Sequence, residues 1–461
     1  MATRRTRHLT WTTPAAPGAA VRAAPLPTAA AAPSAPEAFR LGFHAAPRDQ
    51  AIYLLHVGAE VEHALMVQYL YAGYSLGGPH VVDPEHRRLV GEWKAAVLEV
   101  AREEMGHLAT VENLLTLIGG PLSFEREDYP IPADLYPFPF ELEPLTKTSL
   151  GKYVLAEMPS EEVIDDLRLT QEIEAIRRYV GMEDRVRVHR VGKLYDAIAQ
   201  LFAAPTVPQE PPPEPPPFIA SSDIQADSIR FQVSPAEWGL GYKDLLIETA
   251  YDRTSASAAI SAISIQGEGS TIGPLEASHF GKFLEIYRRF PDESSWRPSK
   301  DVATNPTTAA GAPNAHRITQ PVARLWAGLA NLRYRMLLMY LSHAFRIEAP
   351  ARASGRTVRG LLLSWTFGEM YNLRSITEIL MGLPLHAGGS VLAGPPFEMP
   401  YSLALAPREP DRWRTHRDLL LAARTPVDEL AKSHGAHASY LEGLRSADAR
   451  ALTQVQTIIG G

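Results

Sequence analysis

The sequence predicts an all-α protein built on a four-helix bundle, with additional C-terminal helices. Two observations lead to this prediction. Successive segments place apolar residues at helical spacing, and two widely separated segments, residues 104–107 and 276–279, carry the tetrad Glu-x-x-His. Residues three apart share one helix face, so each tetrad directs a carboxylate and an imidazole toward the same point. Two tetrads, with one Glu from each of two further helices, are the ligand set of a dimetal site in a four-helix bundle.

The amino-acid composition excludes several functions and several kinds of metal site. The net charge is -7 with no basic cluster beyond a few N-terminal arginines, which argues against nucleic-acid binding. The chain has no cysteine, so disulfides and thiolate metal sites are excluded, and His, Asp and Glu must hold any metal. Such ligands favour iron or manganese. No segment approaches the roughly 20 apolar residues that cross a bilayer, and the N-terminus lacks the apolar core of a secretory signal. We therefore expect a cytoplasmic protein that does not enter a membrane.

The bundle is predicted in the first two thirds of the chain. Residues 1–45 are rich in Ala and Pro and are expected to form a flexible arm. A first helix is predicted from Pro47 to Leu76, before Gly77-Gly78-Pro79, and a second from Asp83-Pro84-Glu85 to Gly119. Residues 121–150, rich in Pro and aromatic residues, are expected to be irregular. Further helices are predicted at 160–179, 184–203, 252–268 and 274–290.

Two other features complete the predicted organisation. A Pro-rich insertion at 205–217 cannot be helix or central strand and is interpreted as a stiff spacer, with a lid or docking segment as the alternative. After a polar loop at 291–318, helices are predicted at 319–346, 355–382, 410–432 and 437–458. We therefore divide the chain into an arm (1–45), a metal-binding bundle (46–300) and a helical extension (301–461) packed on the bundle.

The first two helices supply three candidate metal ligands. Glu62 lies in the middle of an apolar stripe on the first helix, and Glu104 lies in a similar stripe on the second, with His107 on its flank. A carboxylate in an apolar stripe needs a partner. A buried ion pair with Lys or Arg is the alternative to metal binding, but neither stripe contains a basic residue. Rotation by about 100° per residue places Glu60 and Glu103 outside the stripes, where we expect them to be solvated.

The later helices supply the remaining candidates. His279 and Glu276 form the second tetrad, although Glu276 is in a first helical turn, where a carboxylate also complements the helix dipole. Glu268, between two glycines, is the candidate from the preceding helix, with a solvated C-terminal turn as the alternative. His63 neighbours Glu62 but is rotated away from it, so support of a ligand or plain packing is expected. No side-chain nucleophile separate from the metal ligands is evident.

The chain resembles a known family in the order of its motifs. They are Ala59-Glu60-Val61-Glu62-His63-Ala64, Glu103-Glu104-Met105-Gly106-His107-Leu108, Gln266-Gly267-Glu268-Gly269, Glu276-Ala277-Ser278-His279-Phe280 and Ala393-Gly394-Pro395-Pro396-Phe397. Over residues 46–400 they are similar to the ferritin-like domain of iminophenylpyruvate dimer synthases. The resemblance implies a ferritin-like bundle with Glu62, Glu104, His107, Glu268, Glu276 and His279 as metal ligands. Members with a large additional region, which we expect this chain to lack, couple two aromatic imino acids in bisindole pathways. Met66-Val67 stands where the family has Ile-Pro, and the Pro-rich insertion is unusual, so substrate identity does not carry over.

Together these features predict a non-haem dimetal oxidase or oxygenase of specialised metabolism. Two iron ions are expected, with manganese as the alternative metal, and O₂ as co-substrate of a small, amino-acid-derived molecule. A homo-oligomer and a redox partner are both compatible with the sequence. Haem-assisted oxidative coupling of aromatic imino acids, an iron-storage protein and a scaffold with a vestigial site are the alternatives. The long C-terminal extension argues against storage, because those helices could enclose a pocket.

Overall fold

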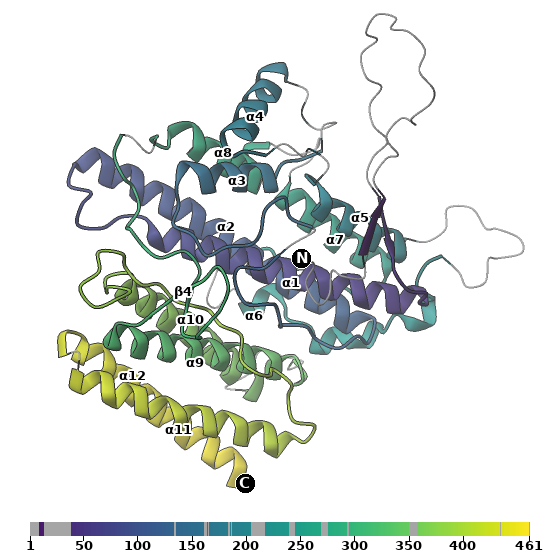
Figure 1. Cartoon of the computed structure of the whole chain (residues 1–461). Coiled ribbons are helices and arrows are strands. Elements are labelled where there is room, and N and C mark those ends of the chain that lie inside the picture. The colour runs from purple at the N-terminus through teal and green to yellow at the C-terminus, as the bar shows by residue number, and fades with distance from the viewer. Residues whose placement is uncertain are drawn as a thin grey trace, which may run out of the picture.

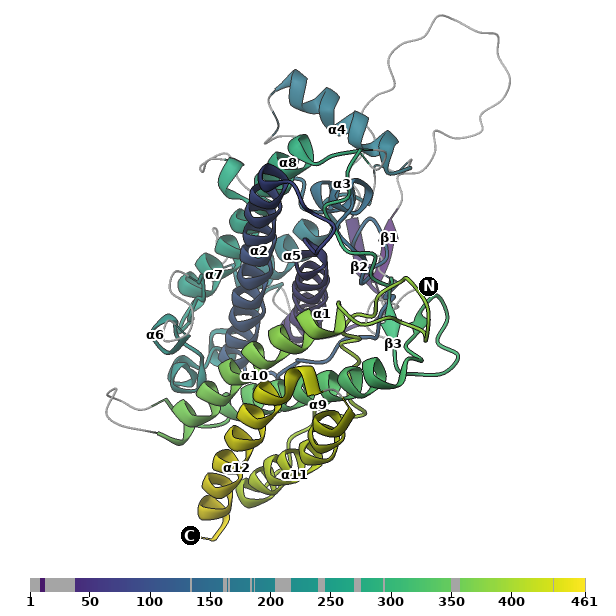
Figure 2. The same ribbon diagram turned by 90° about the vertical axis from the view of Figure 1, so that its left-hand side faces the viewer.

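The computed structural model describes most of the chain as stacked layers of helices. The described residues are 9–12, 38–132, 135–160, 164, 166–182, 185, 187–203, 217–238, 245–268, 275–292, 295–349, 357–433 and 435–460. Figures 1 and 2 show α1 and α2 as a central layer, with α3, α5, α7 and α8 on one side and α9 and α10 on the other. The pair α11 and α12 covers the outer face of α9 and α10. The predicted all-α fold is confirmed.

The central layer begins and ends as the sequence predicts. Helix α1 (Pro47–Ser75) has Pro at its start and ends before Gly77, whose φ is +88°. In α2 (Pro84–Leu117) the side chain of Asp83 accepts a hydrogen bond from the backbone N–H of His86 at 3.0 Å, which caps the helix. Gly119 follows with φ +63°, a conformation that ends helices. Apolar side chains from both helices lie in the main core, which positions their carboxylates away from water.

Four helices cover one face of this layer, and one of them was not predicted. They are α3 (Lys147–Ala156), α5 (Arg190–Phe202), α7 (Arg253–Gly267) and α8 (His279–Arg289). Helix α3 falls inside the segment expected to be irregular, and it starts at a reciprocal capping box between Thr146 and Ser149. Helix α4 (Leu167–Tyr179) packs against α3 and lies farther from the central layer. Helices α4 and α5 begin later than predicted.

The helical extension packs on the opposite face. It comprises α9 (Pro321–Ala344), α10 (Val358–Leu380), α11 (Glu409–Ser433) and α12 (Ala438–Gly460). The hydroxyl of Tyr334 on α9 contacts His63 Nε2 on α1, and Tyr71 on α1 donates to the carbonyl of Ala303. Arg333 of α9 is buried between Glu369 and Asp448, from α10 and α12. These contacts link the central layer to α9, and α9 to α10 and α12.

Shorter elements complete the fold. Two antiparallel strands that were not predicted, β1 (Leu9–Thr12) and β2 (Ala38–Leu41), occur at either end of the Ala/Pro-rich part of the arm. The remaining elements are α6 (Pro235–Trp238), the parallel pair β3 (Pro306–Thr307) and β4 (His316–Arg317), and 3₁₀ turns at Ser221–Asp223, Ala226–Phe231, Leu275–Ala277 and Gly435–His437. Residues 13–37 of the arm and all but the last residue of the Pro-rich segment lie outside the described residues.

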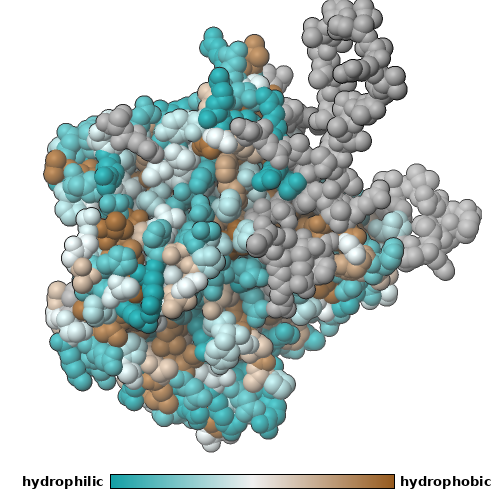
Figure 3. All heavy atoms as spheres, viewed as in Figure 1, coloured by the Kyte–Doolittle hydropathy of each residue, from teal (hydrophilic) through white to brown (hydrophobic). Residues whose placement is uncertain are grey.

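No helix among the described residues has an apolar stretch long enough to cross a bilayer. On the face shown in Figure 3, hydrophobic residues occur in separate patches among hydrophilic ones.

Candidate metal centre

The first half of the site lies between α1 and α2. Glu62, Glu104 and His107 are all buried, and they offer ligand atoms within 4.8 Å of one another. His107 Nδ1 lies 3.0 Å from Glu104 Oε2 and 3.3 Å from Glu62 Oε2. Neither carboxylate has a Lys or Arg ion-pair partner among the residues that the structure describes, so the basic partner considered as an alternative is missing.

The second half shares Glu104 with the first. Glu104, Glu157 and His279 form another group whose ligand atoms lie within 4.8 Å of one another. His279 is the first residue of α8, and its Nδ1 lies 3.0 Å from Glu104 Oε1 and 3.8 Å from Glu157 Oε2. The two oxygens of Glu104 therefore face different histidines. This is the arrangement of a carboxylate that bridges two ions.

A further carboxylate completes the cluster. Glu268 follows α7, and its buried Oε1 has no hydrogen-bond partner among the described residues, although other parts of the residue are partly exposed. It lines a cavity of about 30 Å³ together with Glu62, Glu104, His107 and Glu157. That volume holds about two water-sized occupants. Gly192 on α5 allows this approach, because a Cβ there would lie 2.7 Å from both Glu268 oxygens.

Each histidine also has an oxygen atom beside its outer nitrogen. His107 Nε2 lies 2.9 Å from Gln266 Oε1, and His279 Nε2 lies 3.1 Å from Glu103 Oε2. Glu103 is in turn bound by Lys282 Nζ at 2.8 Å. The hydrogen bond from His107 to Gln266 favours the tautomer with the proton on Nε2, which leaves Nδ1 of His107 free to bind a metal. Both Nδ1 atoms face the shared carboxylate.

Two tyrosines fix the terminal carboxylates in a matching way. Tyr195 on α5 donates its hydroxyl proton to Glu62 Oε1, and Tyr69 on α1 donates to Glu157 Oε1. In each case the other oxygen, Oε2, faces a histidine. The hydrogen bond therefore orients each carboxylate and leaves one oxygen toward the cluster.

Burial and mutual contacts shift the pKa values of these carboxylates and histidines. Burial, with the charge of Glu104 nearby, raises the pKa of Glu62 to about 7, and burial with Glu157 raises the pKa of Glu268 to about 8. Burial opposes a charge on His107, yet its contacts with Glu104 and Glu62 raise its pKa to about 10. Burial likewise opposes ionisation of Glu104, but His279 and His107 hold its pKa below the usual range. Divalent cations replace protons at sites of this kind.

The residues present fit a pair of metal ions. Two ligands of one ion that bind at right angles lie about 3 Å apart, because each bond is about 2.1 Å long. The His279 contacts with Glu104 and Glu103 have hydrogen-bond lengths, but neither has hydrogen-bond angles. The bare Oε1 of Glu268 is a second group that a cation would satisfy. Four carboxylates and two imidazoles match the donor set of dimetal bundles.

The structure brings most, but not all, of the predicted ligands together. Glu62, Glu104, His107, Glu268 and His279 converge. Glu276 does not, because α8 begins at His279 and Glu276 lies exposed in the preceding 3₁₀ turn. Its place is taken by Glu157, which follows the unpredicted helix α3.

Two neighbours expected to be solvated are covered, and three supporting residues were missed. Glu60 is buried and accepts from the backbone N–H of Glu127 at 3.3 Å, whereas Glu103 is covered by α8. His63 is buried against the carbonyl of Phe124 and does not reach the cluster. Sequence reasoning missed Tyr69, Tyr195 and Gln266 as supporting residues. Gln266 belongs to the motif Gln266-Gly267-Glu268-Gly269, and its place two residues before Glu268 could have indicated a role near the site.

A helical bundle with buried carboxylates and histidines at its centre defines the ferritin-like class of protein. The ferritin-like family model matches residues 55–288, so this chain belongs to that family. It is 27% identical over 406 residues to dichlorochromopyrrolate synthase from Lentzea aerocolonigenes, covering 81% of this chain and 38% of that protein. It is 24% identical over 378 residues to 2-imino-3-(indol-3-yl)propanoate dimerase from Chromobacterium violaceum, covering 75% and 33%. The resemblance inferred from the motifs is thus confirmed.

The matches cover only part of the curated relatives. The chain spans about a third of the length of the two curated relatives. Among solved structures, a ferritin-like protein from Caulobacter vibrioides aligns over 72% of this chain and 96% of its own, at 18% identity and a TM-score of 0.42.

Proposed function

We propose that the chain is a non-haem di-iron oxidase or oxygenase acting on a small, amino-acid-derived molecule of specialised metabolism. The observation that carries this proposal is the position of Glu104, whose two oxygens face two different histidines, each in a group of three buried ligands. The ligands would be Glu62, Glu104, His107, Glu157, Glu268 and His279. Two ions held there would supply the binding and reduction of O₂.

The chain's own residues have separate roles in this proposal. Tyr195 and Tyr69 orient the terminal carboxylates, Gln266 holds the tautomer of His107, and Glu103 places a carboxylate beside His279 Nε2. The small cavity and the apolar residues of the bundle core exclude bulk water from the ligands. Iron is preferred over manganese because the proposed reaction consumes O₂, and manganese is the metal alternative for the same ligands.

A second candidate function is the oxidative coupling of two amino-acid-derived imines. The names of both relatives favour it, since one is a synthase of dichlorochromopyrrolate and the other a dimerase of an indolyl imino acid. Product mass distinguishes the candidates, because coupling joins two substrate molecules and oxygenation adds oxygen to one. An intense Soret band in the purified chain would favour the haem-assisted version.

The ligand set gives a direct test. The metal-free chain is titrated anaerobically with Fe²⁺, bound iron is measured by elemental analysis, and O₂ uptake is followed with and without candidate substrates. We expect two iron ions per chain, fewer than one in Glu157→Gln, and two in the matched variant Glu276→Gln. Circular dichroism verifies that both variants fold. The proposal fails if the wild-type chain binds no stoichiometric iron. Substrate-independent O₂ uptake would instead identify iron storage.

A further inference from the structure

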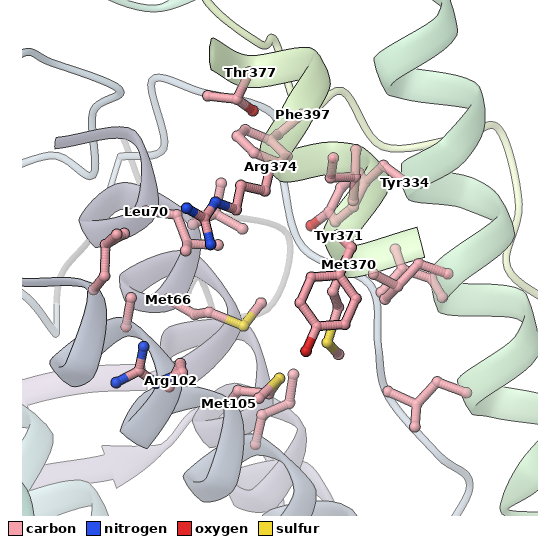
Figure 4. Close-up of a pocket in the computed structure, with 18 of the residues that line it drawn as sticks. Met66, Leu70, Arg102, Met105, Tyr334, Met370, Tyr371, Arg374, Thr377 and Phe397 are labelled. Atoms are coloured by element: carbon pink, nitrogen blue, oxygen red, sulfur yellow. The ribbon is translucent and has the colours of Figure 1, made fainter. Parts of the chain in front are cut away.

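A second cavity lies on the opposite side of the central layer from the metal ligands. It has a volume of about 190 Å³ and is enclosed by α1 and α2 on one side and α9 and α10 on the other. Figure 4 shows Met66 and Leu70 of α1, Met105 of α2, and Tyr334 and Met370 of the extension around this space. No residue that lines it also lines the cavity of the metal centre. The two spaces are therefore separate sites.

The walls of this cavity suit a flat apolar group. Most of the lining side chains are aliphatic, methionine or aromatic. Tyr334 and Phe397 meet edge to face at 5.3 Å between ring centroids, which leaves both rings fixed at the wall. Three methionine thioethers add polarizable, adaptable surface of the kind that contacts aromatic rings well.

Its rim carries positive charge. Arg102 of α2 is exposed and has no ion-pair partner among the residues described, while Arg374 of α10 lies 3.6 Å from Glu378. Figure 4 shows the two arginines on the α2 side and the α10 side of the same space. Glu378 partly neutralises Arg374, so Arg102 is the uncompensated cation. Tyr371, which is 53% exposed, also lines the cavity, so a ligand can reach it from solvent.

The volume limits the size of the occupant. An apolar cavity of about 150 Å³ holds benzene, and pockets for drug-sized ligands begin at about 300 Å³. We propose that this cavity binds an aromatic carboxylate of one or two rings, with the rings among the methionines and aromatic side chains and the carboxylate on the Arg102 guanidinium. Guanidinium and carboxylate groups match in charge and in fork geometry. This proposal does not rest on metal binding at Glu104.

Calorimetric titration of the full chain with indole-3-propionate tests the proposal. The metal-free and Mn²⁺-loaded forms are compared, so that binding at the metal centre would be revealed by competition with the metal. We expect one molecule bound per chain with the same Kd in both forms. Neutral indole and the aliphatic acid octanoate should bind more weakly, since each lacks one of the two recognised groups.

Three substitutions locate the ligand. Arg102→Gln should weaken binding at least about tenfold, because a charge-assisted hydrogen bond is lost, and Arg374→Gln should weaken it less. Arg424→Gln, at an exposed arginine on α11, is the matched control and should leave Kd unchanged. Met66→Trp should fill the cavity and abolish binding. Arg102 is exposed, so its substitution should leave the fold intact, and circular dichroism verifies that the variant is folded.

Three results would overturn the assignment. They are the absence of binding by the wild-type chain at millimolar ligand, a Kd that Arg102→Gln leaves unchanged, and octanoate binding as tightly as the aromatic acid. Loss of binding on Mn²⁺ loading would place the ligand at the metal centre and would also refute the proposal. Because the metal-free form is measured by itself, failure of the di-iron proposal leaves this test intact.

Discussion

Gly106, between Glu104 and His107, offers a sharp test of how residues 245–248 pack against α2 beside the candidate metal ligands. A Cβ at this position would lie 2.2 Å from the carbonyl oxygen of Leu246, a backbone atom. Ordinary contacts are about 3.5 Å, so Gly106→Ala requires a shift of roughly 1 Å. The neighbouring Glu248 is held to α2 by its N–H to Thr110 at 3.0 Å and by Asn113 to its carbonyl at 2.8 Å. The segment therefore cannot move freely.

The expected cost follows from opposing effects. Overpacking costs about 1–3 kcal/mol, and replacing Gly by Ala in a helix returns up to about 1 kcal/mol. With strain on the hydrogen bonds added, we expect Gly106→Ala to lower the free energy of unfolding by about 2 kcal/mol. Gly91→Ala is the matched control on the same helix, because no atom lies within 4 Å of its Cβ position, and it should stabilise by about 0.5–1 kcal/mol.

Denaturant unfolding of the metal-free chain, followed by circular dichroism, measures both effects. Gly106→Ala should move the midpoint to lower denaturant, and Gly91→Ala to higher denaturant, with unchanged slopes. Equal stabilisation by the two substitutions would refute the close approach of residues 245–246 to α2. That result would also show that close packing does not require a glycine between Glu104 and His107.

Three further predictions concern the charged groups. Glu103→Gln should keep bound iron but lower the affinity for it by about 10-fold, because the carboxylate that holds His279 is lost; unchanged affinity in iron titrations would contradict this. Apparent Fe²⁺ affinity should rise from pH 6 to pH 8, since ions must displace protons held by raised pKa values at His107 and Glu62, and calorimetry in two buffers should detect their release; a pH-independent affinity would argue against it. Asp448→Asn should destabilise the chain by about 3 kcal/mol, because Arg333 stays buried with one carboxylate lost; an unchanged unfolding midpoint would count against this role.

The sequence predicted the central layer well because its signals are local. Pro47, Asp83 and the glycines after each helix act on the backbone next to them, so α1 and α2 end close to the predicted positions. Helix α3 was missed because Pro and aromatic residues before Thr146 obscured its capping box. The faces on which Glu62, Glu104 and His107 lie could also be predicted from the phase of α1 and of α2 taken separately. The three side chains converge as that prediction requires.

The errors in the site arise where phase within one helix is not enough. Three-residue spacing places Glu276 beside His279 only if both lie in one helix, but the helix begins at His279. Glu103 lies outside the group of Glu62, Glu104 and His107, as rotation requires, yet α8 covers it and brings Lys282 and His279 to its carboxylate. The tertiary fold decides which element packs over a given helix face. The apolar pattern of a single helix does not carry that information.

The position of Glu104 has a consequence for the order of metal uptake. Glu104 belongs to both groups of ligands, so an ion that binds one of its oxygens also orients the other oxygen toward the second group. On the proposed ligand set, the first ion would displace protons and immobilise Glu104, so the second would enter a prepared site at a lower entropic cost. Uptake should then be cooperative, with singly loaded chains scarce at half saturation. Any substitution at Glu104 would remove this cooperativity and would also lower the affinity for each ion.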